Sequence, residues 1–299
     1  MTGLSALIKR NTKLFFKDKG MFFTAMITPL ILLVLYTTFL SNVFRESYVS
    51  AMPEGFAWDE KVLNGAVGGQ LVSSLLAVCC ITVAFCSNML MVQDKVTGAR
   101  RDLTVSPVKS YTLALGYYIA TFINTFVISL IALGAGVLYI FATGWSLEVG
   151  EVLYLTLDVF LLCMLGTALS SVIGYFLSSQ GQISAVGTIV SAGYGFICGA
   201  YMPIASFGEG LQKVLSFMPF TYCTGLVRNH ALGGVFDEMK AMDYPKEMVE
   251  GLMDGIDCNL YFFGDKVEVG TMYAIVGGTV AMLMATYLVI NLIASKRTR

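Results

Sequence analysis

The sequence has 299 residues, of which 56% are apolar and only 13% are charged, and its mean hydropathy is +0.73. Soluble domains are about half apolar and about a quarter charged, so this composition excludes a water-soluble globule. The net charge of -1 at pH 7 gives no general attraction to nucleic acid, so any useful positive charge must be segregated along the chain.

The N-terminal segment, residues 1–20, predicts an amphipathic helix. Lys9, Lys13 and Lys17 are spaced to fall on one helical face, and leucine, isoleucine and phenylalanine side chains gather on the other. This pattern is typical of a helix that lies in the membrane interface, with its lysines at the lipid headgroups. A solvated basic flank is the alternative interpretation.

Six apolar stretches then follow, each long enough to cross a bilayer, because about 20 residues of helix span the hydrocarbon core. In chain order they are Met21 to Phe44, Val62 to Val92, Leu113 to Ala142, Val152 to Leu177, Ile183 to Ile204 and Val269 to Ala294. The predicted fold class is therefore an all-α integral membrane protein, with one domain over residues 1–299. An even number of spans places both termini on the same side.

The charges of the connecting segments indicate which side that is. The two terminal segments and the loop after the second span carry 12 Lys/Arg and three acids, whereas the three opposite segments carry seven Lys/Arg and 16 acids. Lysine and arginine in short loops remain cytoplasmic. We therefore expect both termini in the cytoplasm and the protein in the plasma membrane.

Few residues point to chemistry within the chain. There is no G-x-x-x-x-G-K-[ST] loop for a nucleotide triphosphate, no G-x-S-x-G or H-E-x-x-H pattern, and only one histidine. We therefore predict no catalytic residue, no metal site and no cofactor held by this chain.

The one ionisable residue within a span is Asp158, for which a polar neighbour is favoured over a substrate contact. An ion-coupled secondary carrier, which usually has several polar groups near the membrane midplane, is the alternative function. Cys223 and Cys258 both fall in the region expected outside the membrane. The sequence is compatible with a disulfide between them and with two free thiols.

Two motifs carry a resemblance to a known family. The loop after the second span contains the acid-base pair Asp94-Lys95, then Gly98, then Leu103, and it closes on Ser106-Pro107-Val108, so that we expect a short helix ending near Ser106. Beyond the fifth span stand the motifs Gly199-Ala200-Tyr201-Met202-Pro203-Ile204 and Met218-Pro219-Phe220-Thr221-Tyr222, followed by Arg228.

In this order the motifs resemble those of ABC type-2 exporter permeases, the membrane subunits of ATP-binding-cassette transporters. The resemblance implies a connecting helix within residues 1–20 and a coupling loop over 94–108, which contacts a separate cytosolic ATPase subunit. It also implies a second permease subunit, identical or not, with ATP and Mg bound by the ATPase. The coupling residues it indicates are Asp94, Lys95, Gly98, Ala99, Arg100 and Leu103.

The same resemblance makes the second and fifth spans the lining of the transport path. The candidate lining residues are Ser73, Ser74, Thr82, Ser87, Thr188, Ser191 and Tyr194. Because this lining is mildly polar and uncharged, it favours an amphipathic, lipid-like or drug-like cargo, with a peptide or glycan-lipid also open.

The region 205–268 is expected to hold short re-entrant helices and an acidic cap, with Pro203, Pro219, Tyr222 and Arg228 as its marker residues. Two pairs of glycines within the spans are spaced four residues apart: Gly65 with Gly69, and Gly195 with Gly199. This spacing is typical of close contacts between helices, and we favour this interpretation over a role as hinges.

Overall fold

The computed structural model describes residues 2–50, 58–105, 108–145 and 147–297. Nearly all of the described chain is helical. The elements are α1 (Thr2–Lys17), α2 (Lys19–Leu35), the π-helix η1 (Tyr36–Leu40), α3 (Ser41–Ser50), α4 (Glu60–Val96), α5 (Ala99–Val105), α6 (Ser110–Gly144), α7 (Val149–Phe176), α8 (Gln180–Ile197), the 3-10 helix η2 (Ile204–Ser206), α9 (Glu209–Leu215), α10 (Pro219–Ala241), α11 (Lys246–Gly255), β1 (Leu260–Phe262), β2 (Asp265–Val267) and α12 (Val269–Arg297).

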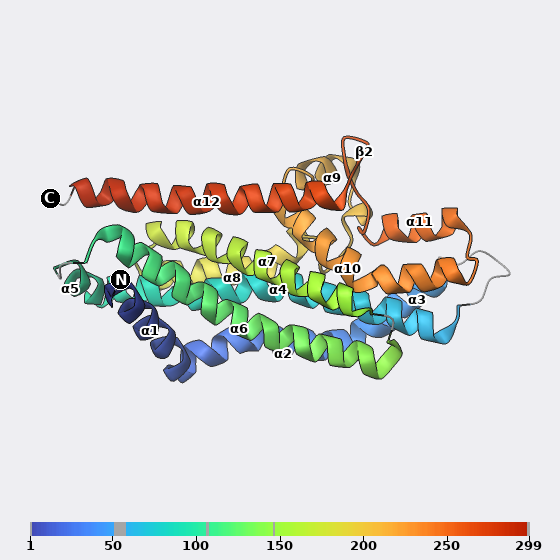
Figure 1. The fold of residues 1–299 in the computed structure, drawn as a ribbon, viewed down its shortest axis with the longest axis horizontal. Coiled ribbons are helices and arrows are strands. Elements are labelled where there is room, and N and C mark those ends of the chain that lie inside the picture. Colours follow the sequence, from blue (N-terminus) through green and yellow to red (C-terminus); the bar gives the residue numbers. More distant parts are fainter. Residues whose placement is uncertain (1, 51–57, 106–107, 146, 298–299) are drawn as a thin grey trace.

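The long helices form an elongated bundle (Figure 1). Five helical segments are long and apolar enough to cross a membrane: residues 19–50, 60–96, 110–144, 149–176 and 269–294. The start of α1, the end of α12 and the short helix α5 lie at one end of the bundle, whereas α3, α9 and α11 lie at the other (Figure 1). The expected all-α membrane class is therefore confirmed, and both chain ends lie together.

The expected layout of six spans is not confirmed. The fifth predicted span, Ile183 to Ile204, corresponds to α8, which ends at Ile197 and is not one of the five segments. The helix ends because Gly199 has a φ of +76°, a conformation that other residues rarely adopt, and the amides of Ala200 and Tyr201 turn back to the Gly195 carbonyl.

Helix α4 is the centre of the bundle. In its most apolar window, 89% of the residues are buried, against 17% in α12 and 22% in the segment from α2 to α3. Glycines allow this close packing: a Cβ at Gly69 would lie 2.7 Å from the Ala231 carbonyl of α10, and one at Gly136 of α6 would lie 2.7 Å from Val72. The packing interpretation of Gly69 therefore agrees with the structure, and the contact is within one subunit.

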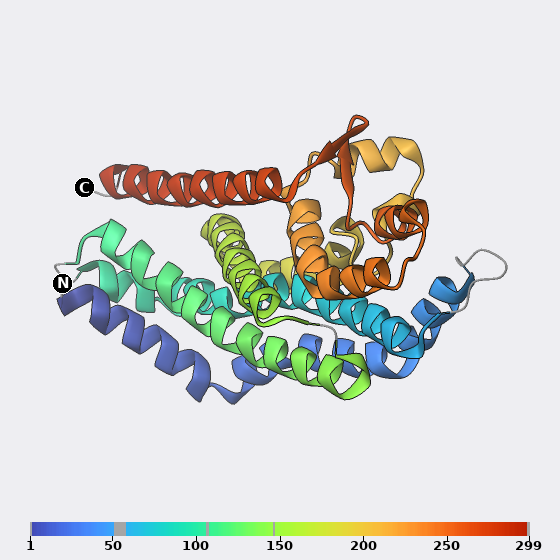
Figure 2. The same ribbon diagram turned by 45° about the vertical axis from the view of Figure 1, so that its right-hand side comes forward.

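The outer region differs from the expected series of short helices. Figure 2 shows α9, α10, α11 and the β-hairpin gathered at the end of the bundle away from the termini. Helix α10 begins at Pro219, a favourable first helical residue, and continues to Ala241 between α4, α7 and α12. At 23 residues it is longer than the short helices expected in this region, and it continues through Gly225 and Gly233 without a break.

The hairpin is a departure from an all-helical chain. Strands β1 and β2 pair antiparallel, with Leu260 opposite Val267 and Phe262 opposite Asp265. Phe263 and Gly264 form the two-residue turn, and both have positive φ angles, +52° and +98°. This is the backbone pattern of a type I′ turn, which joins twisted strands tightly.

Candidate functional site

The loop predicted to couple to an ATPase lies where α4 ends and α5 begins. Gly98 separates the two helices with a φ of +85°, so the chain turns sharply between them. A Cβ at Gly98 would meet no atom within 4 Å, which shows that its requirement is conformational and not steric. Ser106 and Pro107, the expected end of the coupling helix, lie outside the described residues; within them, α5 runs to Val105.

Asp94 holds three elements together at this end. Its two carboxylate oxygens accept hydrogen bonds from the Arg10 guanidinium of α1, at 2.7 and 3.1 Å, and the Tyr117 hydroxyl of α6 donates at 2.6 Å. The hydrogen bond with Asp94 raises the pKa of Arg10, although partial burial opposes it. Arg10 also donates to Asn11 at 2.8 Å. The predicted coupling residue Asp94 is thus buried inside this subunit.

Lys95, its neighbour in sequence, reaches a different element. Its ammonium group donates to the carbonyls of Gly174, Tyr175 and Leu177, at 2.9, 2.5 and 3.1 Å. These carbonyls lie at the C-terminal end of α7, where a helix leaves its last acceptors without partners and favours a cation. Lys95 also lies 5.2 Å from the centre of the Tyr175 ring.

The rest of the predicted coupling set is only partly accessible. Ala99, Arg100 and Leu103 are half-buried, and Arg100 lies 5.9 Å from the Tyr175 ring centre. The exposed surface of the motif, which we call the α5 face, consists of Val96, Thr97, Arg101, Asp102, Thr104 and Val105. Sequence reasoning missed this division because it depends on which way α5 is turned.

The predicted path residues of α4 do not face an open space. Ser73, Ser74, Thr82 and Ser87 are all at most 1% exposed. Thr82 bonds its own helix at the Val78 carbonyl, and Ser87 accepts a hydrogen bond from Asn124 of α6 at 3.1 Å. On α8, by contrast, Thr188 is exposed, Ser191 is half-buried, and Tyr194 is buried. The structure of one subunit therefore does not bring the seven residues together.

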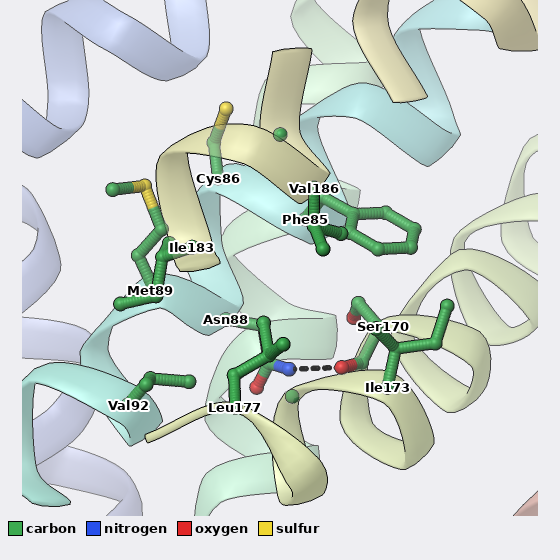
Figure 3. Close-up of a pocket in the computed structure, with 12 residues that line it drawn as sticks. Phe85, Cys86, Asn88, Met89, Val92, Ser170, Ile173, Leu177, Ile183 and Val186 are labelled. Carbon is green, nitrogen blue, oxygen red and sulfur yellow. Dashed lines mark hydrogen bonds between the residues drawn. The ribbon is translucent and has the colours of Figure 1, made fainter. Parts of the chain in front are cut away.

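A small cavity lies between α4, α7 and α8 (Figure 3). Its volume is about 40 Å³, and its lining is mainly apolar, with Phe85, Met89 and Ile183 among the labelled residues. The Asn88 amide donates to the Ser170 carbonyl at 2.6 Å, while its own carbonyl oxygen is buried without a partner among the described residues. The cavity is close to the size of one water molecule, so it is too small for a cargo.

The outer motif residues converge on a buried ion pair. Arg228 of α10 is 0% exposed and donates to Asp257 at 2.9 Å and to the Gly199 carbonyl at 2.5 Å. Asp257 also accepts the backbone N–H groups of Ile204 and Ala205, at 2.6 and 3.1 Å. The pair therefore links the end of α8 to α10 and to the loop after α11. Asp257 was not predicted, because nothing distinguishes it from the other acids of its segment.

The other three marker residues shape the same region. Pro203 precedes η2, Pro219 opens α10, and the Tyr222 hydroxyl donates to the Ser216 carbonyl at 2.5 Å. Together they fix the two turns that connect α8 to α10. Through Asp257, the structure links Arg228 to the residues that follow Pro203, and the functional role of the marker residues is a proposal.

Asp158 has the polar neighbours that were favoured for it. It is 0% exposed; the Tyr273 hydroxyl of α12 donates to one oxygen at 2.6 Å, and the Nδ1 atom of His230 lies 2.6 Å from the other. His230 stacks on Tyr154, with ring centres 5.0 Å apart. The sequence has one histidine, His230, and one acidic residue within a predicted span, Asp158. Pairing these two residues could have predicted the contact.

The cysteines of the outer region are separate thiols. Cys223 and Cys258 are both buried and both free. Burial raises the pKa of Cys258 to about 12, which suppresses its reactive thiolate. The open question of a disulfide is thus answered by two free thiols in this structure. No cluster of three or more potential metal ligands occurs among the described residues.

These features define a multi-pass helical membrane protein, whose long helices are joined by polar contacts at both ends of the bundle and within it. A family model described as ABC-2 family transporter protein matches residues 52–296, and the chain belongs to this family. The resemblance seen in the motifs is therefore confirmed. A search of curated proteins found no match to the chain.

Proposed function

We propose that this chain is the membrane-spanning permease subunit of an ATP-driven exporter, which works with a separate cytosolic ATPase subunit. The observation that carries the proposal is the pair Asp94 and Lys95 beside the α5 face. One binds α1 and α6, and the other binds the end of α7. A push on α5 by an ATPase would thus reach three further helices through short polar contacts.

In this proposal α1 is the interfacial connecting helix, and both termini and α5 are cytoplasmic. Helix α8, at 18 residues, crosses most of the bilayer as a sixth span, since a helix rises about 1.5 Å per residue and the hydrocarbon core is about 30 Å thick. A second permease subunit, identical or not, completes the transporter in the plasma membrane. ATP and Mg bind to the ATPase, and the cargo is an amphipathic, lipid-like or drug-like molecule.

We infer the position of the transport path from the exposure of the candidate lining residues. Because the α4 serines and threonines are buried within the subunit, the exposed side of α8, with Thr188, is the better candidate lining in this state. The α4 residues would reach the path only if α4 moved relative to α8. This agrees with a mechanism in which a push on α5 moves the end of α4.

Copurification tests the proposal. Arg101→Glu and Val105→Asp change exposed side chains of the α5 face, so each should reduce retention of a co-expressed ABC ATPase subunit by about tenfold, as expected for about 1.4 kcal/mol of lost binding energy. Lys213→Glu, on the exposed surface of α9, is the matched control and should retain the ATPase fully. Equal retention by all three variants would contradict the proposed docking surface.

An ion-coupled carrier is the second candidate, favoured by one observation. Buried Asp158 and half-buried His230 and Tyr273 form a network of titratable groups within the bundle. Transport that follows an ion gradient in proteoliposomes without any ATPase, and that is lost in Asp158→Asn, would support this function and contradict the first.

A further inference from the structure

Aromatic side chains are exposed where the end of α9 meets the β-hairpin. The ring centre of Phe217, just after α9, lies 5.2 Å from that of Phe262 and 5.7 Å from that of Phe263. Phe262 and Phe263 are 4.9 Å apart. Although the three rings pack on one another, Phe217 and Phe263 are each 63% exposed. More than half of each of these two residues is therefore left uncovered by the described part of the chain.

Helix α9 extends this apolar surface. Leu211 and Val214 are three residues apart on α9, so they lie on the same face of the helix, and both are exposed. The amide of Phe217 donates to the Val214 carbonyl at 3.3 Å, and this turn connects the exposed face of α9 to the aromatic rings. We call Leu211, Val214, Phe217, Phe262 and Phe263 the outer apolar patch.

The hairpin turn holds a bulky side chain in an unfavourable conformation. Phe263 has a φ of +52° and is the first of the two turn residues, before Gly264. Turns of type I′ favour asparagine, aspartate or glycine at this position, because bulky residues rarely adopt a positive φ. The exposed ring of Phe263 gives little packing within the chain in return for this strain. Strained residues occur mostly at functional sites, so this phenylalanine indicates a contact outside the chain.

The outer apolar patch lies where one surface of the membrane is expected. Strand β2 ends at Val267, and the segment of α12 that is long and apolar enough to cross a membrane begins at Val269. Figures 1 and 2 show α9 and the hairpin close to the start of α12, at the edge of the bundle across from α2. Because only 17% of the most apolar window of α12 is buried, the patch continues an uncovered apolar surface at the level where α12 leaves the membrane.

The charges around the patch are of both signs. Lys213 of α9 and Lys266 of β2 are exposed, and so are the acids Glu209, Asp265 and Glu268. Anionic lipids attract clusters of lysine and arginine, and no such excess of positive charge occurs here. Mixed charge instead suits a zwitterionic headgroup, which carries both a phosphate and an ammonium group. Attraction to a membrane at this position would therefore come from the apolar side chains.

We propose that the outer apolar patch inserts into the membrane interface and that its side chains contact the acyl chains of zwitterionic lipids. Interfacial helices place their apolar side about 5–10 Å into the boundary between headgroups and acyl chains. At that depth the patch leaves water, while the lysines and acids around it remain among the headgroups. Insertion would fix the depth of α9 and of the start of α12 in the bilayer. This contact requires neither an ATPase nor transport, so it goes beyond the proposed function.

Fluorescence quenching by brominated lipid tests the insertion. The full-length chain has two tryptophans, so Trp58→Phe and Trp145→Phe give a silent background into which Phe263→Trp introduces one reporter. The protein is placed in nanodiscs of phosphatidylcholine, either plain or brominated near the ester end of its acyl chains. We expect bromination to remove about half of the fluorescence of Phe263→Trp, because a group about 5–10 Å below the headgroup boundary lies close to the bromines.

Two further reporters in the same background make the result specific. Phe217→Trp, whose ring contacts the hairpin from α9, should be quenched to a similar extent. Met242→Trp is the control, because Met242 is also exposed and apolar but belongs to the turn between α10 and α11, which lies beyond the hairpin (Figure 1). It should retain its fluorescence. Absence of quenching in both patch reporters, or equal quenching of Met242→Trp, would overturn the proposal.

A variant of the turn separates insertion from folding. Phe263→Asn removes the ring but supplies a residue that a type I′ turn favours, so the native temperature of thermal unfolding should be retained. In the Phe217→Trp reporter chain, Phe263→Asn should reduce the quenching about twofold, because the patch loses apolar surface. Lys266→Gln should leave the quenching unchanged, as should the addition of phosphatidylglycerol. Quenching that depends on the anionic lipid, or that is unaffected by Phe263→Asn, would contradict insertion driven by the apolar side chains.

A second copy of the chain is the other occupant that could cover the patch, and it gives different results. The patch reporters would then be shielded from brominated lipid, and Phe263→Cys would form disulfide cross-links between copies under oxidation. This pair of results would overturn the contact with lipid. All of these measurements are made on the purified chain without an ATPase, so their failure is separable from a failure of the ATPase to bind the α5 face.

Discussion

Asp94 and Lys95 are adjacent residues with opposite charges and separate tasks. Successive side chains on a helix point about 100° apart, so two neighbours at the end of α4 can contact different helices. Asp94 bonds to Arg10 and Tyr117, while Lys95 occupies the carbonyls that end α7. The acid-base order of the motif is therefore explained by the packing of this subunit alone.

The charge of Asp94 should matter for stability. Asp94→Asn retains the size of the side chain and an acceptor for Tyr117 but leaves Arg10 without its ion pair. We expect a loss of about 1.5 kcal/mol in the free energy of unfolding, the range for a hydrogen bond to a charged group. Thermal unfolding in detergent measures it. Asp102→Asn, on the exposed α5 face, should change nothing, and an equal loss in both would refute the role given to Asp94.

Arg228 should be far more sensitive than any exposed arginine. Arg228→Met leaves Asp257 buried without its partner, for which we expect a loss of about 3 kcal/mol. The double variant Arg228→Met with Asp257→Asn removes both charges and should recover part of that loss. Chemical denaturation of the native protein, the two single variants and the double variant gives the comparison. A double variant less stable than the sum of the single changes would contradict a paired role.

At the scale of the elements, the joint between α4 and α5 depends on one glycine. Gly98→Ala forces a residue with a Cβ into a left-handed conformation, at a cost of about 1 kcal/mol. Because no atom lies near, Gly98→Asn should be milder, since asparagine tolerates this conformation. Retention of the co-expressed ATPase should follow the order Gly, Asn, Ala. Equal retention by the alanine variant would show that the turn is not needed.

The sequence predicts the long elements better than their ends. Five of the six apolar stretches correspond to helices long and apolar enough to cross a membrane, because uninterrupted hydrophobicity of that length has few alternatives in a membrane protein. The β-hairpin and the full length of α10 were missed, because α10 continues beyond its apolar part into the charged residues Asp237, Glu238 and Lys240, where hydrophobicity gives no signal. The polar contacts of Lys95 and Asp257 join segments distant in sequence, and no local pattern encodes such pairs.

At the scale of the whole molecule, maleimide labelling of cysteine thiols can show on which side of the membrane each end of the bundle lies. Native Cys258 should react slowly with a maleimide at pH 8, because a pKa near 12 leaves only about one thiol in 10⁴ as thiolate. The thiolate fraction rises as pH approaches that pKa, so labelling should increase with pH and on unfolding. Rapid labelling of Cys258 in the folded protein at pH 8 would contradict its burial.

Because buried Cys258 should contribute little labelling, the labelling of an introduced cysteine reports on the exposure of that position. Ser206, shortly before α9, and Thr104, in α5, are both exposed, and α9 and α5 lie toward opposite ends of the bundle (Figure 1). An impermeant maleimide added to intact cells should label Ser206→Cys at once and Thr104→Cys only after permeabilisation. The reverse pattern would invert the proposed orientation.

The unequal burial of the helices has a consequence for how the chain can diverge. In α12 only 17% of the most apolar window is buried, so most of its side chains have no fixed neighbour within this subunit and any apolar side chain suits them. In α4, at 89%, each side chain meets fixed neighbours of definite shape. Substitutions should thus accumulate freely along the last helix, while the central one drifts slowly, although the two have similar hydrophobicity.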